Sequence, residues 1–122
     1  MTRQQRWAKG AFERVQSVSS KGSEHAAKYR THCMKMPVLL KQSGLVQAVA
    51  FLRSRRGDEA ASDYCNHLAQ VYGGEKCDGK ALQEAAHGEG NLGRYLALCR
   101  DVVAVSVWFR RFAQSELPSG GV

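Results

Sequence analysis

The sequence predicts an all-α protein, a compact antiparallel bundle of about five to six helices joined by short connections. Three observations favour this fold. Apolar residues recur at intervals of three and four, which places them on one face of a helix. Glycines separate the successive periodic segments, as they commonly do where helices end. No segment shows the sustained alternation of apolar and polar residues that a half-buried strand would need.

The first predicted helix spans residues 2–19 and is ended by Lys21-Gly22. Its apolar face is formed by Trp7, Ala11, Val15 and Val18. Ser23-Glu24 can cap a second helix. The apolar face of that helix is formed by Ala26, Tyr29, Cys33, Met36 and Leu40. Because Pro37 lacks an amide hydrogen and crowds the preceding turn, we expect the second helix to kink or restart near Met36.

Gly44 is the expected left-handed terminator of the second helix. A third helix follows over residues 45–53, with its buried side formed by Leu45, Ala48, Val49 and Leu52. Gly57-Asp58 ends it. A fourth helix, over residues 59–72, is expected to bury Tyr64, Cys65, Leu68 and Val71. Glycines then separate it from a short helix over residues 80–87.

The last helix is expected to begin after the cap residue Asn91 and to reach Leu117. One of its apolar stripes is formed by Leu92, Tyr95, Leu96, Cys99 and Val103. A second stripe, nearly opposite, is formed by Ala97, Ala104, Val105, Trp108 and Phe112. So much apolar surface indicates either a central helix or one covered by a partner. We expect residues 1–117 to form a single domain and residues 118–122 to form a flexible tail.

Charge is distributed unevenly along the chain. Through Arg56, twelve Lys and Arg residues accompany only two acidic residues, whereas six basic and nine acidic residues follow. The amino-terminal part should therefore attract polyanions, and the opposed charges would let copies of the chain stack. The alternative is that the net charge of +7 serves only solubility.

The sequence contains no pattern that predicts catalysis, a metal site or a cofactor. Its four cysteines form no CxxC pair, and we expect reduced thiols, with Cys33, Cys65 and Cys99 packed in the core. His32 precedes Cys33 directly, and adjacent helical side chains point about 100° apart, which disfavours a Cys–His nucleophile. Residues 88–93 spell GxGxxG, but no strand precedes them, so we expect an interhelical turn.

The polar amino terminus lacks the apolar segment of a signal peptide. The longest apolar runs are also too short to span a membrane. We therefore expect a cytoplasmic protein.

Basic residues are the one group of side chains in the sequence that indicates a binding function. The candidate nucleic-acid-binding residues are Lys28, Arg30, Lys35, Lys41, Arg53, Arg55, Arg56, Arg110 and Arg111. The first four lie on the two flanks of the second helix. The three within residues 53–56 either complement the negative end of a helix dipole or clamp phosphates. Such a surface contacts the phosphate backbone and does not read base sequence.

Two segments of the chain resemble a known family. They are residues 29–52, YRTHCMKMPVLLKQSGLVQAVAFL, and residues 107–117, VWFRRFAQSEL. In this order they resemble the signature segments of the small subunit of the Cmr complex, a type III-B CRISPR RNA-guided effector. The positions we assign to this structural motif are Pro37, Gly44, Leu45, Phe51, Leu52, Trp108 and Phe112. Ser43, Phe109 and Arg110 depart conservatively from the usual residues, and residues 57–90 resemble nothing identifiable.

The resemblance implies a non-catalytic helical subunit that stacks along the backbone of the complex and contacts guide RNA and target RNA in antiviral defence. Its implied partners are the other Cmr subunits, copies of itself and RNA. No membrane, cofactor or small-molecule substrate is implied. The basic residues would hold phosphates, while Trp108 and Phe112 would pack the bundle. A stand-alone helical DNA-binding regulator, which should present base-reading residues and form a two-fold dimer, and a small cysteine-dependent enzyme are the alternatives.

Overall fold

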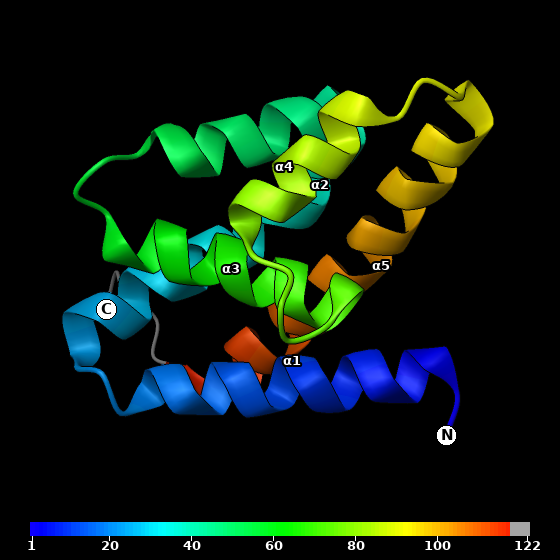
Figure 1. Ribbon diagram of the computed structural model, residues 1–122. Coiled ribbons are helices and arrows are strands. Elements are labelled where there is room, and N and C mark those ends of the chain that lie inside the picture. Colours follow the sequence, from blue (N-terminus) through cyan, green and yellow to red (C-terminus); the bar gives the residue numbers. More distant parts are fainter. Residues whose placement is uncertain (118–122) are drawn as a thin grey trace.

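The computed structural model describes residues 1–117, which fold into five helices without a strand (Figure 1). The helices are α1 (Arg3–Ser19), α2 (Ser23–Ser54), α3 (Glu59–Gly73), α4 (Gly79–Gly88) and α5 (Leu92–Glu116). The predicted all-α bundle is confirmed. The predicted tail, residues 118–122, lies outside the described residues.

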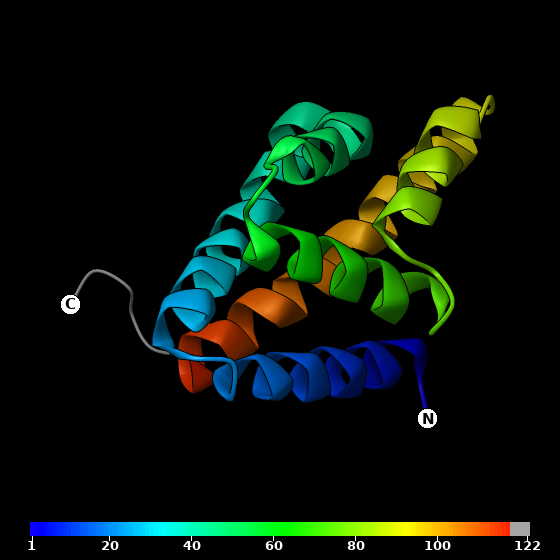
Figure 2. The same ribbon diagram turned by 60° about the vertical axis from the view of Figure 1, so that its left-hand side comes forward.

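The long helix α2 changes direction at Gly44, which separates a first arm, residues 23–43, from a second arm, residues 45–54 (Figure 2). Gly44 has φ 84° and ψ 168°, a backbone conformation that favours glycine. The expected restart near Met36 is wrong, because Gly44 is the one non-helical residue within α2 and is where the two helical segments meet. Pro37 fits inside the first arm since its fixed φ is compatible with a helix. The expected side-chain cap by Ser23-Glu24 is also wrong, because Gly22 occupies the cap position.

Tyr95 of α5 supports the bend in α2. The amide of Val46 donates a hydrogen bond to the Tyr95 hydroxyl at 3.4 Å. Amides in the first turn of a helical segment have no acceptor within that segment, so α5 supplies one here. A Cβ at position 44 would lie 3.5 Å from the same hydroxyl, which is an ordinary contact. Glycine is therefore required at the bend for its positive φ and not for space.

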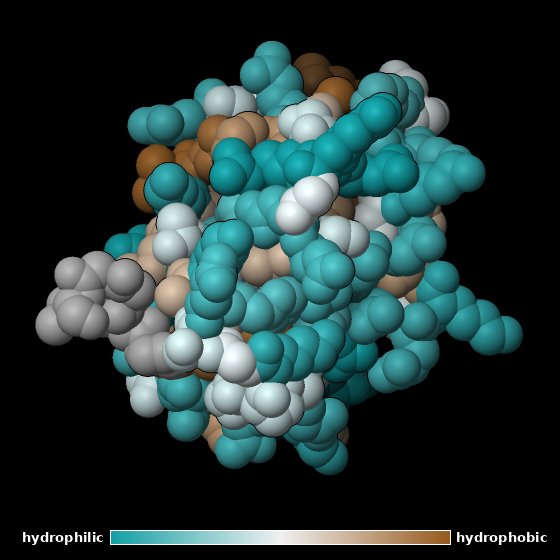
Figure 3. Space-filling view, turned by 90° about the vertical axis from the view of Figure 1, so that its left-hand side faces the viewer, coloured by the Kyte–Doolittle hydropathy of each residue, from teal (hydrophilic) through white to brown (hydrophobic). Residues whose placement is uncertain are grey.

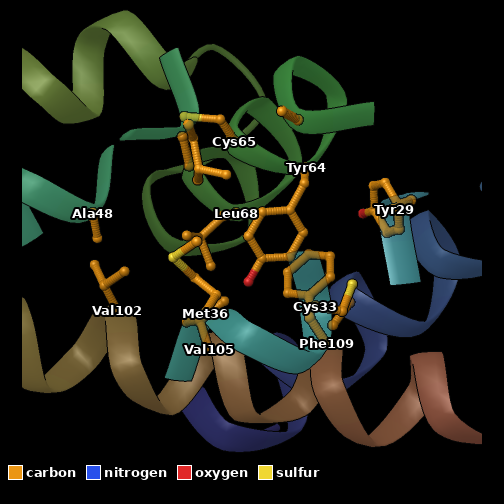
Figure 4. Packing of buried hydrophobic residues seen from close by; sticks show 14 of the residues in the cluster. Tyr29, Cys33, Met36, Ala48, Tyr64, Cys65, Leu68, Val102, Val105 and Phe109 are labelled. Atoms are coloured by element: carbon orange, nitrogen blue, oxygen red, sulfur yellow. The ribbon is translucent and has the colours of Figure 1, made fainter. Parts of the chain in front are cut away.

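The core lies between α1, α2, α3 and α5 (Figure 4). The apolar faces predicted for residues 2–53 are all buried. Tyr64 of α3 joins the helices, because its ring lies edge-on to Tyr29 of α2 at 5.6 Å and to Phe109 of α5 at 5.5 Å between centroids. Of the four residues predicted to be buried in the fourth helix, three are buried and Val71 is half-buried.

The buried face of α5 shares only Val105 with the two predicted stripes. It is formed by Val102, Val105, Ser106, Phe109 and Ala113. Most residues of the two stripes are half-buried flanks of this single broad face, since α1 and α2 both pack against α5. Leu92 and Leu96, near the start of α5, are 71% and 57% exposed. Despite its apolar surface, α5 does not qualify as a membrane span, and neither does any other helix within residues 1–117.

Helices α1 and α5 run in the same direction. Arg3 forms an ion pair with Asp101 at 3.3 Å, and further along both helices Phe12 lies edge-on to Phe112 at 5.3 Å between centroids. The two contacts advance together along the chain. This pair is therefore parallel within the bundle.

Candidate nucleic-acid interface

A cleft of about 470 Å³ opens between the two arms of α2 and the turn that leads to α3. We call it the basic cleft. It brings together four of the predicted binding residues, Lys28, Lys35, Arg55 and Arg56. The bend at Gly44 makes this possible, because it returns the second arm toward the first. Residues far apart along α2 thereby become the two walls of one cleft.

The basic cleft also has an apolar part. Met36 is buried, Leu39 is half-buried, and Phe51 on the second arm is 41% exposed. An exposed phenyl ring beside cations is a surface on which flat, anionic molecules are held well. Figure 3 shows the side of the molecule that carries the α1–α2 and α2–α3 turns; hydrophilic residues cover most of it, and apolar residues emerge mainly in its upper part.

A hydrogen-bonded group anchors the base of the cleft. The Nε2 atom of buried His32 lies 3.1 Å from Oδ2 of Asp58, and Nε of Arg55 donates to the same oxygen at 3.2 Å. The other carboxylate oxygen accepts the amide of Ala61 at 3.0 Å and so caps α3. Burial would raise the pKa of Asp58, but these hydrogen bonds outweigh it and lower the pKa to about 2. Burial lowers the pKa of His32.

The three arginines at and just after the end of α2 have different interaction partners. Arg53 donates a hydrogen bond to Gln83 of α4. Arg55 is held by Asp58, and its guanidinium lies over the Phe51 ring at 5.4 Å. Arg56 is exposed and has no ion pair or side-chain hydrogen bond with any residue of the described range. Of the three, Arg56 is therefore the one most available to an external phosphate.

A second cleft, of about 320 Å³, lies between the first arm of α2 and the end of α5. It collects three more of the predicted binding residues, Lys41, Arg110 and Arg111. Pro37 and Val38 form its apolar part. The two clefts therefore account for seven of the nine predicted residues. Arg30, which is half-buried, and Arg53 line neither cleft.

Trp108 and Phe112 pack at the edge of the core. Both are half-buried and stack on each other with centroids 5.9 Å apart. The Trp108 indole donates to Gln4 at 2.9 Å, and the Arg111 guanidinium lies 5.1 Å from the Trp108 ring centroid. This aromatic pair therefore connects the α1–α5 contact to the second cleft.

Cysteine and histidine side chains form no close pair of the kind that catalysis would use within residues 1–117. Cys33 and Cys65 are buried, as predicted, while Cys99 is half-buried. Burial raises the pKa of Cys65 to about 11, which disfavours the reactive thiolate. His32 faces Asp58, and His67 lies against the Tyr29 hydroxyl at 2.8 Å.

We expect His67 to make stability depend on pH. Burial lowers the pKa of His67 to about 4, against about 6.5 in an unfolded chain. The unfolded chain therefore binds more protons between these values, so stability is complete above pH ~6.5 and falls toward pH ~4. The slope for one such group is at most about 1.4 kcal/mol per pH unit.

Denaturant unfolding across this pH range measures the effect. His67→Gln, which keeps an acceptor for Tyr29 but cannot titrate, is expected to have a flatter profile than the parent chain. Equal slopes in the two proteins would contradict the assignment, because other titrating groups are common to both.

Sequence reasoning missed that His32 and Asp58 belong to the basic cleft. The sequence placed Asp58 at the end of the third predicted helix, whereas in the structure its bond to the Ala61 amide makes it the cap of α3. A signal was present for His32, because it shares a helical face with Lys28 and Lys35 at spacings of four and three. The approach of Asp58 was not readable in this way, since it depends on how α3 packs against α2.

Comparison with known proteins places this fold in the CRISPR-associated class. A family model described as "CRISPR-associated protein (Cas_Cmr5)" matches residues 3–116. The CRISPR system Cmr subunit Cmr5 of Thermus thermophilus is 47% identical over 114 residues, which cover 93% of this chain and 95% of that protein. A crystal structure of a CRISPR-associated Cmr5 family protein from the same organism superposes with a TM-score of 0.87 at 44% identity, covering 97% of this chain and all of that one. The chain belongs to the Cmr5 family.

Proposed function

We propose that this chain is the small, non-catalytic subunit of a cytoplasmic Cmr effector complex, where it binds guide or target RNA through phosphate contacts at its two clefts. The observation that carries the proposal is the convergence of Lys28, Lys35, Arg55 and Arg56 on the basic cleft. The 47% identical relative is itself described as a subunit of a Cmr system, which supports membership of such a complex.

Electrostatics favours a polyanion over a small acidic ligand. The first 56 residues have a net charge of +10, and their cations contribute to both the basic cleft and the second cleft. Clustered cations of this kind gain free energy from counterion release when they neutralise phosphates of a polyanion. They do so without reading base identity. The chain would thereby hold RNA in place while another subunit performs the chemistry.

The family likeness also supports contacts with other subunits. Within α5, Leu92 and Leu96 are exposed on the half of the helix away from the second cleft. We propose that further copies of the chain and the backbone subunits of the complex are its protein partners. Purification of the chain from its native cell, followed by identification of the proteins and RNA that accompany it, tests this part of the proposal.

Reversing Lys35 and Arg56 to Glu is expected to weaken binding of single-stranded RNA by roughly 10- to 100-fold at low salt. Neither side chain has an ion-pair partner among residues 1–117, so reversing them breaks no ion pair in that range. The dependence of log affinity on log salt should become shallower by about 0.7 for each lost phosphate contact. Fluorescence anisotropy over a salt series measures both quantities.

The matched control reverses Lys76 and Lys80, which changes the net charge equally. One is in a turn and one in a helix, as are Arg56 and Lys35, and both are exposed. The control should bind RNA nearly as the parent does. Equal losses in the two variants would mean that only total charge matters, and failure of the parent chain to bind at low salt would refute the RNA contact.

A further inference from the structure

We propose that the basic cleft accommodates one unstacked nucleotide of a single RNA strand, with its base against Phe51 and its phosphate at the cationic rim. The inference rests on the proposed RNA contact but goes beyond it. A phosphate-binding surface needs only cations, whereas this cleft combines cations with an exposed aromatic ring and a hollow of defined size.

The size of the cleft suits a nucleotide. Its volume of about 470 Å³ falls within the roughly 300–1,000 Å³ that is typical of sites for small ligands. An extended row of phosphates would not require such a hollow, because long Lys and Arg side chains reach a backbone from a flat or convex surface. The hollow therefore has room for a compact group of nucleotide size.

Phe51 supplies a stacking surface. Among the large apolar side chains that are exposed within residues 1–117, Phe51 is the only aromatic one. The Arg55 guanidinium lies over the same ring at 5.4 Å and is fixed there by Asp58. Ring and guanidinium together form a platform of the kind on which bases stack, and every base has a face that fits it.

The rim of the cleft matches the charge of a nucleotide. Lys35 and Arg56 are exposed and have no ion-pair partner in the described part of the chain. Lys28 is paired only with the exposed Glu24, at 3.4 Å. Exposed pairs of this kind are weak, so Lys28 can exchange its partner for a phosphate at little cost.

Polar groups inside the cleft do not select a particular base. Asp58 already accepts hydrogen bonds from His32, Arg55 and the Ala61 amide. The Thr31 hydroxyl donates to the Ala27 carbonyl at 3.1 Å, which leaves it only acceptor capacity. We therefore expect the cleft to require a base without distinguishing one base from another, in agreement with a subunit that binds RNA of any sequence.

The experiment compares two single-stranded RNAs of about 12 nucleotides, one intact and one in which abasic sites replace every nucleotide but all phosphates remain. The parent chain should bind the intact RNA roughly tenfold more tightly, the size expected for one stack of a base on an aromatic ring. Phe51→Leu, which keeps an apolar side chain, should lose this preference and bind both RNAs alike. Leu96→Ala, which trims an exposed apolar residue elsewhere, should keep the preference.

Further outcomes separate the nucleotide site from the RNA contact itself. If the parent chain binds intact and abasic RNA equally while the Lys35 and Arg56 reversal still weakens both, the nucleotide site is refuted and the phosphate contact stands. If the parent binds neither RNA, both proposals fail. A preference that persists in Phe51→Leu would place the base outside this cleft. The comparison of intact with abasic RNA on the parent chain tests the nucleotide site even if Phe51→Leu folds poorly.

Discussion

Phe109→Ala is expected to lower the free energy of unfolding by about 3–5 kcal/mol, the usual cost of removing a fully buried phenyl ring. Phe109 is completely buried, and its ring lies edge-on to Tyr64 at the point where α2, α3 and α5 meet. Truncation there leaves a cavity that three helices cannot close without losing other contacts. Chemical denaturation followed by circular dichroism measures the change.

The neighbouring Trp108→Ala is the matched control. Trp108 is larger but half-buried, and its indole nitrogen bonds to Gln4 near the solvent. We expect a smaller loss, about 2–3 kcal/mol, because part of the indole is already exposed to solvent in the folded chain. A larger loss from Trp108→Ala than from Phe109→Ala would show that the centre of the core has been misplaced.

Asp58→Ala is expected to destabilise the protein by about 2–4 kcal/mol, since it removes two kinds of interaction at once. The α3 cap is lost, and Arg55 and buried His32 are both left without their shared carboxylate partner. Asp78→Ala provides the comparison, because Asp78 caps α4 through the Ala81 amide at 2.8 Å and has no ion pair with another residue of the described range. It should cost about 1 kcal/mol, the value of a cap alone.

The two aspartate variants also differ in their dependence on acid. The hydrogen bonds that lower the pKa of Asp58 to about 2 stabilise the fold above its unfolded pKa of about 3.8, and this contribution disappears as the pH falls through the folded value. The difference in stability between the parent and Asp58→Ala should therefore shrink in strong acid. Equal destabilisation by Asp58→Ala and Asp78→Ala at neutral pH would mean that the bonds from His32 and Arg55 to Asp58 add no stability beyond the cap.

Local sequence signals were sufficient for the helices and for most of the core. Where a helix packs with one face against the rest of the protein, apolar residues at intervals of three and four identify that face. Trp7 to Val18 of α1 are an example. The same reasoning failed on α5, because two neighbouring helices bury a wide arc there. Its centre, at Phe109, belongs to neither of the predicted stripes.

The bend in α2 was predicted at the wrong residue for a physical reason. Pro37 weakens a helix by removing one amide donor, but its fixed φ is compatible with a helix. Its side chain is buried in the first arm, and this packing favours the helical conformation there. Gly44 was expected only to end a helix. In the structure it also sets the direction in which the chain continues, which depends on its φ of 84° and on Tyr95, a residue 51 positions away.

The sequence was sufficient to list the candidate cations, but the clefts that bring them together depend on the tertiary structure. Lys35 and Arg56 share a cleft only because the second arm returns over the first. Lys41 meets Arg110 only because α5 passes beside α2. Spacing within one helix cannot reveal such neighbours.

The basic cleft has rigid walls. Both arms of α2 are anchored in the core by buried side chains on a face adjacent to the cleft. These are Tyr29, Cys33 and Met36 on the first arm and Leu45, Val49 and Leu52 on the second. No lid or loop within residues 1–117 has to become ordered before a ligand enters, so on the protein side only exposed side chains such as Lys35 and Arg56 would lose freedom. The shape of the hollow is thus set before any ligand arrives, and one glycine with a positive φ maintains the bend that creates it.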